Sequence, residues 1–264
     1  MCLLLAVDLA AAPAAWTPPL GIPYPSFGIT NTHWMYTNSI YTWDYGAGPV
    51  PYRTNEFGPY THYVDNSNPN SLHNEVTNPW GSPAQPRQRW PYPLPAGSAV
   101  QVRGPGPYSF GNGPSGVMAA GGNGTEALPI FMYGTQTNEA SMPMVCSGSR
   151  VEFYQFGNWM IVERLRSTNG ISVNTRPNLK GGPVTNVCVR DCYFSATLGN
   201  GGNCFTTGGS SGNSAANYTR DFVILRSVVH DYGDWQASFE NDATDAVLSE
   251  NATNIWMLNC ESYQ

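Results

Sequence analysis

Charged residues are scarce in this chain. Asp, Glu, Lys and Arg make up 11% of its 264 residues, whereas globular domains usually contain about 25%. Its 12 basic and 18 acidic side chains give a net charge of −6 at pH 7, and the basic residues form no stripe or cluster. Because nucleic-acid binding depends on such a basic surface, the sequence predicts no nucleic-acid partner.

Long apolar runs and the common catalytic motifs are also missing. No stretch reaches the roughly 20 consecutive apolar residues that a membrane-spanning helix needs, so we expect no membrane span. The chain has no G-x-S-x-G elbow, P-loop, H-E-x-x-H motif or dinucleotide-binding fingerprint. These absences argue against the usual serine hydrolases, nucleotide-binding enzymes and zinc proteases.

The residues in excess are Gly (28), Pro (22), Tyr (15) and Trp (8), a mixture that favours turns and strands over helices. Residues 1–16 contain a short apolar run and an Ala-Ala-Pro-Ala-Ala stretch suited to signal-peptidase cleavage. We interpret them as a signal-peptide remnant and expect a secreted or extracellular protein. Residues 17–98 have no sustained period, and their many prolines and aromatic residues predict an irregular N-terminal cap.

The cysteines form no recognisable framework. Removal of the signal peptide would leave five of the six, at irregular spacings, with neither an even disulfide set nor paired zinc-ligand spacings. We therefore expect most of them to be small buried thiols.

Short strand-like segments recur from residue 99 onward. Four of them, MIVERLRST, VCVRDCYFS, FVILRSVVH and IWMLNCESY, begin at residues 160, 187, 222 and 255, at spacings of 27, 35 and 33 residues. The first and third positions of each are apolar, and side chains two residues apart lie on the same side of a strand. We expect these eight positions to face one continuous core: Met160, Val162, Val187, Val189, Phe222, Ile224, Ile255 and Met257.

Three further features of this alignment support a repeating architecture. The sixth position holds side chains suited to an inward corner, and we expect a stacked column of Leu165, Cys192, Ser227 and Cys260, with the two thiols too far apart for a disulfide. Second strands are expected within 170–174, 203–208 and 245–251, so that each repeat has two strands. By the same register Val223 and Trp256 point outward, and this apolar strip should be covered.

Repeats of this length, with strands and tight turns, favour a β-solenoid over the alternative of a sandwich. The segments TNVCVRDCYF, RDFVILRSVVHDYG and TNIWMLNCESYQ resemble the repeats of the pectate-lyase-like superfamily. This resemblance covers residues 99–264 and implies an all-β fold, a right-handed parallel β-helix (solenoid) preceded by the irregular cap of residues 17–98. The superfamily includes polysaccharide lyases, glycoside hydrolases, esterases, epimerases and adhesins, so the function must come from the site.

The segment 230–245 concentrates groups that could carry chemistry. Neighbouring carboxylates can cleave glycosidic bonds or ligate Ca²⁺, and aromatic rings can stack on sugars. We predict catalytic roles for Asp231, Asp234, Asp242 and His230, and substrate binding by Tyr232 and Trp235. Ca²⁺ is the candidate cofactor, with its ligands undefined. The alternative is a solvated loop whose polar side chains bond turn amides.

Arginines on or beside the strands form a second candidate group. The resemblance implies lyases that use Arg or Lys to remove the C5 proton of an acidic sugar and neutralise the uronate. On that hypothesis Arg226, close to the segment 230–245, binds substrate. The alternative is that these arginines form surface ion pairs with neighbours such as Glu163 and Asp191.

The sequence therefore predicts a secreted carbohydrate-active β-helix protein, a polysaccharide hydrolase or lyase. The competing class is a non-catalytic adhesin or appendage protein with a glycan-binding face, and a phage or virus fibre is a third. The last segment stops before its second strand. We expect a parent protein to continue beyond it, and the open end to offer a surface for self-association.

Overall fold

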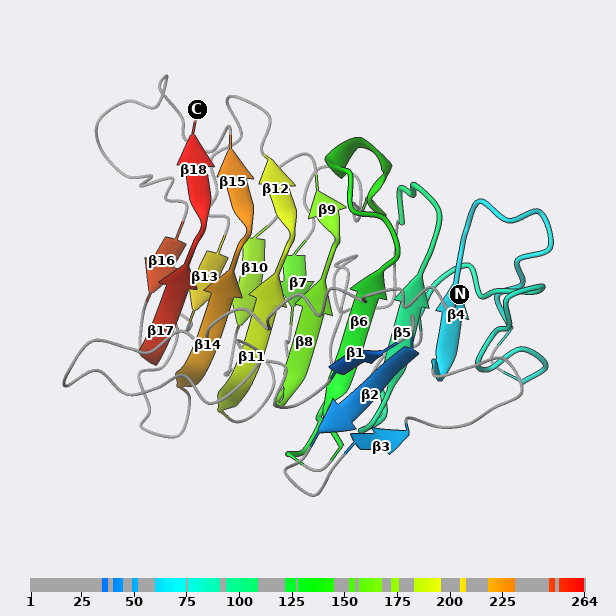
Figure 1. The fold of residues 1–264 in the computed structure, drawn as a ribbon, viewed down its shortest axis with the longest axis horizontal. Coiled ribbons are helices and arrows are strands. Elements are labelled where there is room, and N and C mark those ends of the chain that lie inside the picture. Colours follow the sequence, from blue (N-terminus) through cyan, green and yellow to red (C-terminus); the bar gives the residue numbers. More distant parts are fainter. Residues whose placement is uncertain are drawn as a thin grey trace, which may run out of the picture.

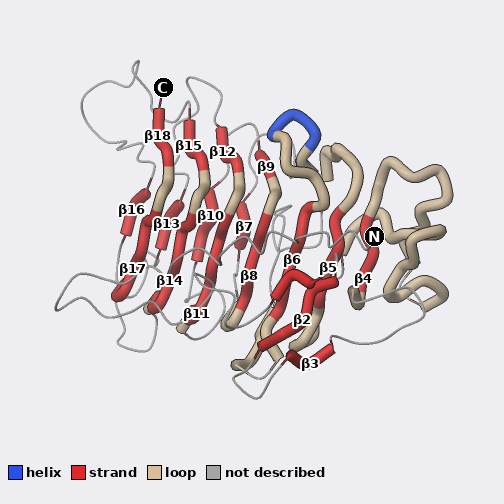
Figure 2. Tube along the Cα trace, viewed as in Figure 1, coloured by secondary structure: helices blue, strands red, loops and turns tan. Residues whose placement is uncertain are grey.

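The protein is a strand-rich, all-β structure (Figure 1). The computed structural model describes residues 35–37, 40–44, 49–51, 60–74, 76–90, 94–108, 122–126, 128–144, 152–154, 157–167, 172–175, 183–195, 205–207, 218–230, 247–249 and 252–263, with backbone alone in β1–β3, β7, β10, β13 and β16. Within these residues the one helix is the 3₁₀ turn η1, Glu139–Ser141 (Figure 2). No helix in the described part of the chain is long and apolar enough to cross a membrane.

The largest sheet has seven strands, in the order β17-β14-β11-β8-β6-β5-β4, and every pair in it is parallel. Its strands are β4 (His62–Val64), β5 (Ala99–Val102), β6 (Ile130–Gly134), β8 (Met160–Glu163), β11 (Val184–Arg190), β14 (Thr219–Leu225) and β17 (Ala252–Leu258). Parallel neighbours require the chain to return to the same end between strands, so each strand begins a new circuit.

Two four-stranded parallel sheets complete these circuits. One contains β7 (Glu152–Tyr154), β10 (Ser172–Thr175), β13 (Phe205–Thr207) and β16 (Val247–Ser249). The other contains β9 (Arg166–Ser167), β12 (Tyr193–Ser195), β15 (Val228–His230) and β18 (Glu261–Tyr263). Each of the four repeats from β7 to β18 thus contributes one strand to each of three sheets. A separate antiparallel sheet joins β1 (Met35–Thr37), β2 (Ile40–Asp44) and β3 (Pro49–Pro51).

The predicted register of the four aligned segments is confirmed. Val187 is paired with Met160 and with Phe222, and Phe222 is paired with Ile255, with the third positions following in step. Six of the eight predicted core positions are at most 1% exposed, and Ile255 packs against the same cluster. Met257 keeps the register but is 46% exposed, because β17 lies at the edge of the sheet.

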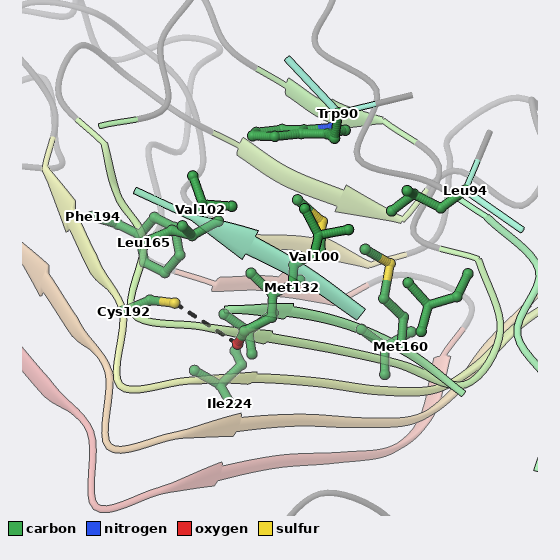
Figure 3. Close-up of a cluster of buried hydrophobic side chains, with 14 of the residues drawn as sticks. Trp90, Leu94, Val100, Val102, Met132, Met160, Leu165, Cys192, Phe194 and Ile224 are labelled. Atoms are coloured by element: carbon green, nitrogen blue, oxygen red, sulfur yellow. Dashed lines mark hydrogen bonds between the residues drawn. The ribbon is translucent and has the colours of Figure 1, made fainter. Parts of the chain in front are cut away.

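The stacked column at the sixth position is also confirmed. Leu165, Cys192 and Ser227 are fully buried, and Cys260 packs against them (Figure 3 shows the first two). The carbonyls of the first three each accept a hydrogen bond from a backbone amide of the next repeat, as that of Leu165 accepts from the amide of Tyr193. Cys192 and Cys260 are free thiols, as predicted.

The structure differs from the prediction in the number of strands per repeat. The expected second strands are present as β10, β13 and β16, paired in parallel. Each nine-residue segment, however, consists of two strands in different sheets, such as β8 and β9. The chain turns at the fifth residue, which adopts a left-handed conformation in every repeat, so a repeat has three strands instead of two.

The seven-stranded sheet also begins before residue 99. Strand β4, within the range expected to be irregular, pairs with β5, and the Thr61 side chain donates to the Ala99 carbonyl at 3.0 Å. The three residues of β4 are too few to show a period in the sequence. Trp90 and Leu94 complete the core at this end (Figure 3).

The outer face of the seven-stranded sheet is covered, as expected for the strip that contains Val223. A second apolar cluster includes Phe131, Ile161, Cys188 and Val223, each at most 1% exposed, and Trp256 packs against it. The long sheet is therefore buried on both faces over its middle strands, which is typical of parallel sheets.

Candidate functional site

The sequence-predicted site residues fall into two groups. Asp231, Tyr232, Asp234, Trp235 and Asp242 lie outside the described residues. His230 and Arg226 are described, at the end of β15 and at the turn before it.

His230 lies on the outer face of the sheet formed by β9, β12, β15 and β18. Side chains alternate along a strand, and the preceding Val229 packs in the core, so His230 points the other way. Its register partners are Ser195 and Tyr263. The sheet therefore holds a hydroxyl, an imidazole and a phenol in one row across three strands.

Two contacts define the surroundings of His230. Its Nε2 atom lies 3.4 Å from Oε1 of Glu139, an ion pair when the imidazole is protonated. Its ring stacks on that of Tyr263, with centroids 5.1 Å apart and planes 11° from parallel. The Glu139 side chain is 43% exposed and that of His230 is 14% exposed, and Tyr263 is 52% exposed. In this patch, His230 with Glu139 and Tyr263, the carboxylate and the phenol ring are exposed, whereas the imidazole is mostly covered and its Nε2 atom is buried.

Glu139 is held by a local cap that its neighbours dictate. The Asn138 side chain accepts a hydrogen bond from the Ala140 amide at 2.9 Å, which starts the 3₁₀ turn. Nothing in the sequence links Glu139 with His230, which is 91 residues further along. Only the stacking of the strands brings them together.

Arg226 is engaged by a neighbouring carboxylate. Its Nε and Nη2 atoms donate to the two carboxylate oxygens of Asp191 at 2.7 and 2.6 Å. The hydrogen bond to Asp191 raises the pKa of Arg226. This bidentate geometry matches the alternative of a surface ion pair considered for the arginines.

Left-handed residues form two columns that the sequence analysis missed. In the part of the chain that the structure describes, the positive-φ residues other than glycine are Trp159, Asn186, Asp221 and Asn254 in one column and Arg164, Asp191, Arg226 and Asn259 in the other, at φ between 46° and 58°. Asn and Asp tolerate this conformation best. Asn or Asp recurs immediately before the first aligned position and again at the fifth position. This recurrence is the sequence feature that could have predicted the two columns.

A polar row crosses the outer face of the long sheet. Gln101, Tyr133, Glu163 and Arg190 are consecutive register partners on β5, β6, β8 and β11. Arg190 donates from Nε to Oε2 of Glu163 at 2.9 Å. Both ionic side chains are only 3% to 4% exposed, too little to admit a polymer, so the pair is a structural element.

Tyr133, a member of this row, also contacts a second tyrosine and an arginine. Tyr60 stacks on Tyr133 with centroids 6.2 Å apart, and Arg164 donates to the Tyr133 hydroxyl at 2.6 Å. Burial raises the pKa of Tyr60 well above its ordinary value. A phenol held neutral in this way cannot serve as a base near neutral pH.

Two histidines of the N-terminal region form hydrogen bonds with other side chains of that region. His62 Nδ1 lies 2.7 Å from the Thr61 hydroxyl, and His73 accepts from Arg89. No group of three or more His, Cys, Asp or Glu side chains within the described ranges could hold a metal ion. The carboxylates of segment 230–245, which could hold Ca²⁺, lie outside those ranges.

Comparison with known proteins identifies no relative. No protein-family model matches the chain, and no curated protein and no solved structure matches it. What the structure establishes is an all-β chain with parallel sheets.

Proposed function

We propose that this chain is a secreted right-handed parallel β-helix protein that binds and cleaves a polysaccharide. Three parallel sheets, entered in turn by every repeat, support this architecture. The observation that carries the function is the patch at His230, where a mostly covered imidazole contacts an exposed carboxylate and an exposed aromatic ring.

The chemistry of this patch suits a sugar chain. The Tyr263 ring offers an apolar face for a pyranose. His230 is an imidazole, the side chain most often used for proton transfer, and the Glu139 carboxylate lies 3.4 Å from its Nε2 atom. The chain then enters segment 230–245, whose Asp231, Asp234 and Asp242 would supply further carboxylates for glycosidic cleavage.

A non-catalytic glycan-binding rod is the second candidate. It is favoured by the fact that the described part of the patch contains a single carboxylate next to His230, that of Glu139. Glycosidic hydrolysis normally uses two. The exposed Tyr263 ring at the edge of the sheet would bind sugar without turnover.

The test is turnover and binding measured on a panel of polyuronates and neutral plant, algal and microbial polysaccharides. Released reducing ends would indicate hydrolysis, and unsaturated uronates would indicate a lyase. We expect His230→Asn and the single changes Asp231→Asn, Asp234→Asn and Asp242→Asn to lower turnover while binding persists.

A matched pair of aromatic variants completes this experiment. Tyr263→Ala should weaken binding, whereas Tyr218→Ala, at the start of β14, should not. Binding without turnover in the unmodified chain would establish the second candidate. Turnover unchanged in all four polar variants would remove the His230 patch and its loop from the mechanism.

A further inference from the structure

A polar hollow of about 440 Å³ lies at the other end of the molecule. It is lined by Asn66, His73, Gln88 and Arg89. Asn66 follows β4, the edge strand of the long sheet opposite to β17. The volume lies within the range of small-ligand sites in proteins.

The walls of this hollow are fixed by two buried polar side chains. Arg87 is fully buried, and its guanidinium donates to the carbonyls of Asn78, Pro79 and Arg89 at 2.7 to 3.0 Å. The Asn78 side chain donates to the Leu72 carbonyl at 3.0 Å. Since Arg87 is anchored to the backbone of Arg89, the hollow is rigid before any ligand arrives.

A glycine sets the turn that brings Arg87 beside β4. Gly81 has φ of 71°, and a Cβ there would lie 2.4 Å from the Tyr63 carbonyl oxygen. The amide of Arg87 donates to that same oxygen at 2.8 Å. A larger residue would push the Arg87 segment away from the sheet.

Arg89 gives the hollow an oriented positive charge. Its Nε donates to Nε2 of His73 at 2.8 Å, which fixes the plane of the guanidinium. Its two terminal nitrogens have no hydrogen-bond partner among the described residues. The neighbouring Asp65 carboxylate accepts from the amide and hydroxyl of Ser67 instead. A guanidinium held in this way is suited to an oxyanion.

The side-chain amides of Asn66 and Gln88 offer hydrogen-bond acceptors, in contrast to the donors of Arg89. Asn66 donates through Nδ2 to the Pro107 carbonyl at 2.8 Å, and Gln88 donates through Nε2 to that of Ser71 at 3.4 Å. Their side-chain oxygens are therefore left as acceptors. Acceptors would repel a bare inorganic anion but would bind hydroxyl groups.

We infer that this hollow binds one acidic sugar unit, with its carboxylate or sulfate ester on Arg89 and its hydroxyls on Asn66 and Gln88. An oxyanion and several hydroxyls on one small ring are the combination that matches one cation and two acceptors. The site is separate from the His230 patch and does not require cleavage there.

The test is calorimetric titration of the full chain with glucuronate, glucose 6-sulfate, glucose and inorganic sulfate. We expect at least one of the two charged sugars to bind about tenfold or more tightly than glucose and inorganic sulfate. Which of the two binds identifies a carboxylate or a sulfate ester as the anion. Equal binding of glucose would overturn the role of the charge, and equal binding of inorganic sulfate would overturn the role of the sugar.

Two variants and one control assign the binding to this hollow. Arg89→Gln should lower the affinity for the charged sugar about tenfold. Gln88→Glu, at an exposed position that should not disturb folding, should lower it as well by repelling the anion. Arg220→Gln makes the same charge change on an exposed side chain of β14 and should leave the affinity unchanged. Unaltered affinity in both hollow variants would refute the assignment.

Discussion

The two edges of the long sheet lie in different surroundings. At one edge, β4 is covered by the segment around Arg87, and Val64 is fully buried. At the other, β17 repeats the apolar positions of β14 in register, yet Met257 is 46% exposed where its partner Ile224 is 0% exposed. The alternation of apolar residues thus determines which face of the sheet a side chain lies on, whereas its burial depends on what lies beside the strand.

The largest difference between covered and exposed positions is expected for two ion pairs made by successive residues. Arg190 pairs with Glu163 in the covered row, and Asp191 pairs with Arg226 at the exposed corner. Glu163→Gln should lower the free energy of unfolding by about 3 to 5 kcal/mol, because it leaves a buried guanidinium without its counter-charge. Asp191→Asn should cost about 1 kcal/mol or less.

Urea denaturation of both variants measures this difference. An equal loss in the two variants would mean that the outer face of the sheet is hydrated.

The next largest effect on stability is expected from truncating Ile224 and its register partner Met257. Ile224→Ala should destabilise by about 2 to 5 kcal/mol through lost burial and a cavity. Met257→Ala, at the edge, should cost about 1 kcal/mol or less. The same denaturation curves report both. If Met257→Ala costs as much as Ile224→Ala, β17 is covered in solution, and a second copy of the chain would be the first candidate to test by mass determination.

The left-handed columns give a smaller effect. Asn186→Ala should destabilise by about 1 to 2 kcal/mol, because alanine tolerates φ of 58° poorly. Asn186→Gly is the matched control, since glycine adopts this conformation without strain. Thermal unfolding should rank the alanine variant below the glycine variant. The reverse order would assign the role of Asn186 to its side-chain contacts.

Thiol reactivity distinguishes the buried middle of the molecule from its exposed edge without any change to the sequence. Burial raises the pKa of Cys188 from 9.0 to about 12, and that of Cys192 even further. Burial raises the pKa of Cys260 too, but its side chain is only partly covered. Peptide mapping after brief alkylation at pH 8 should find Cys260 modified before Cys188 and Cys192.

The same shift gives a pH dependence with a definite sign. The unfolded chain releases the Cys188 proton first, so stability should fall as the pH rises from 9 toward 12. Cys188→Ala should weaken this dependence. Rapid alkylation of Cys188 in the folded chain would show that the outer face is open.

The sequence predicted the strands of the long sheet better than the site. Alternation of apolar residues was sufficient to place Met160, Val187, Phe222 and Ile255 in one row, because a period of two is a local property. The fifth-position turn was missed because Arg164 and Arg226 are unusual in a left-handed conformation, and they obscured the Asn and Asp that share their column.

The site could not be predicted because its contacts are not local. His230 was recognised as a chemical group, but its partners Glu139 and Tyr263 come from a turn and a strand far away in the chain. The polar hollow likewise depends on Arg87, whose complete burial no composition rule anticipates for a charged residue.

The two left-handed columns have a consequence for insertions and deletions. Aligned segments begin 27, 35 and 33 residues apart, yet the four residues between the left-handed positions, such as 187–190 and 222–225, keep one length and one register. Length variation therefore falls between these blocks. A peptide grafted after His230 should leave the sheets in place, whereas one residue added between Asn186 and Asp191 should turn the rest of β11 to the wrong face.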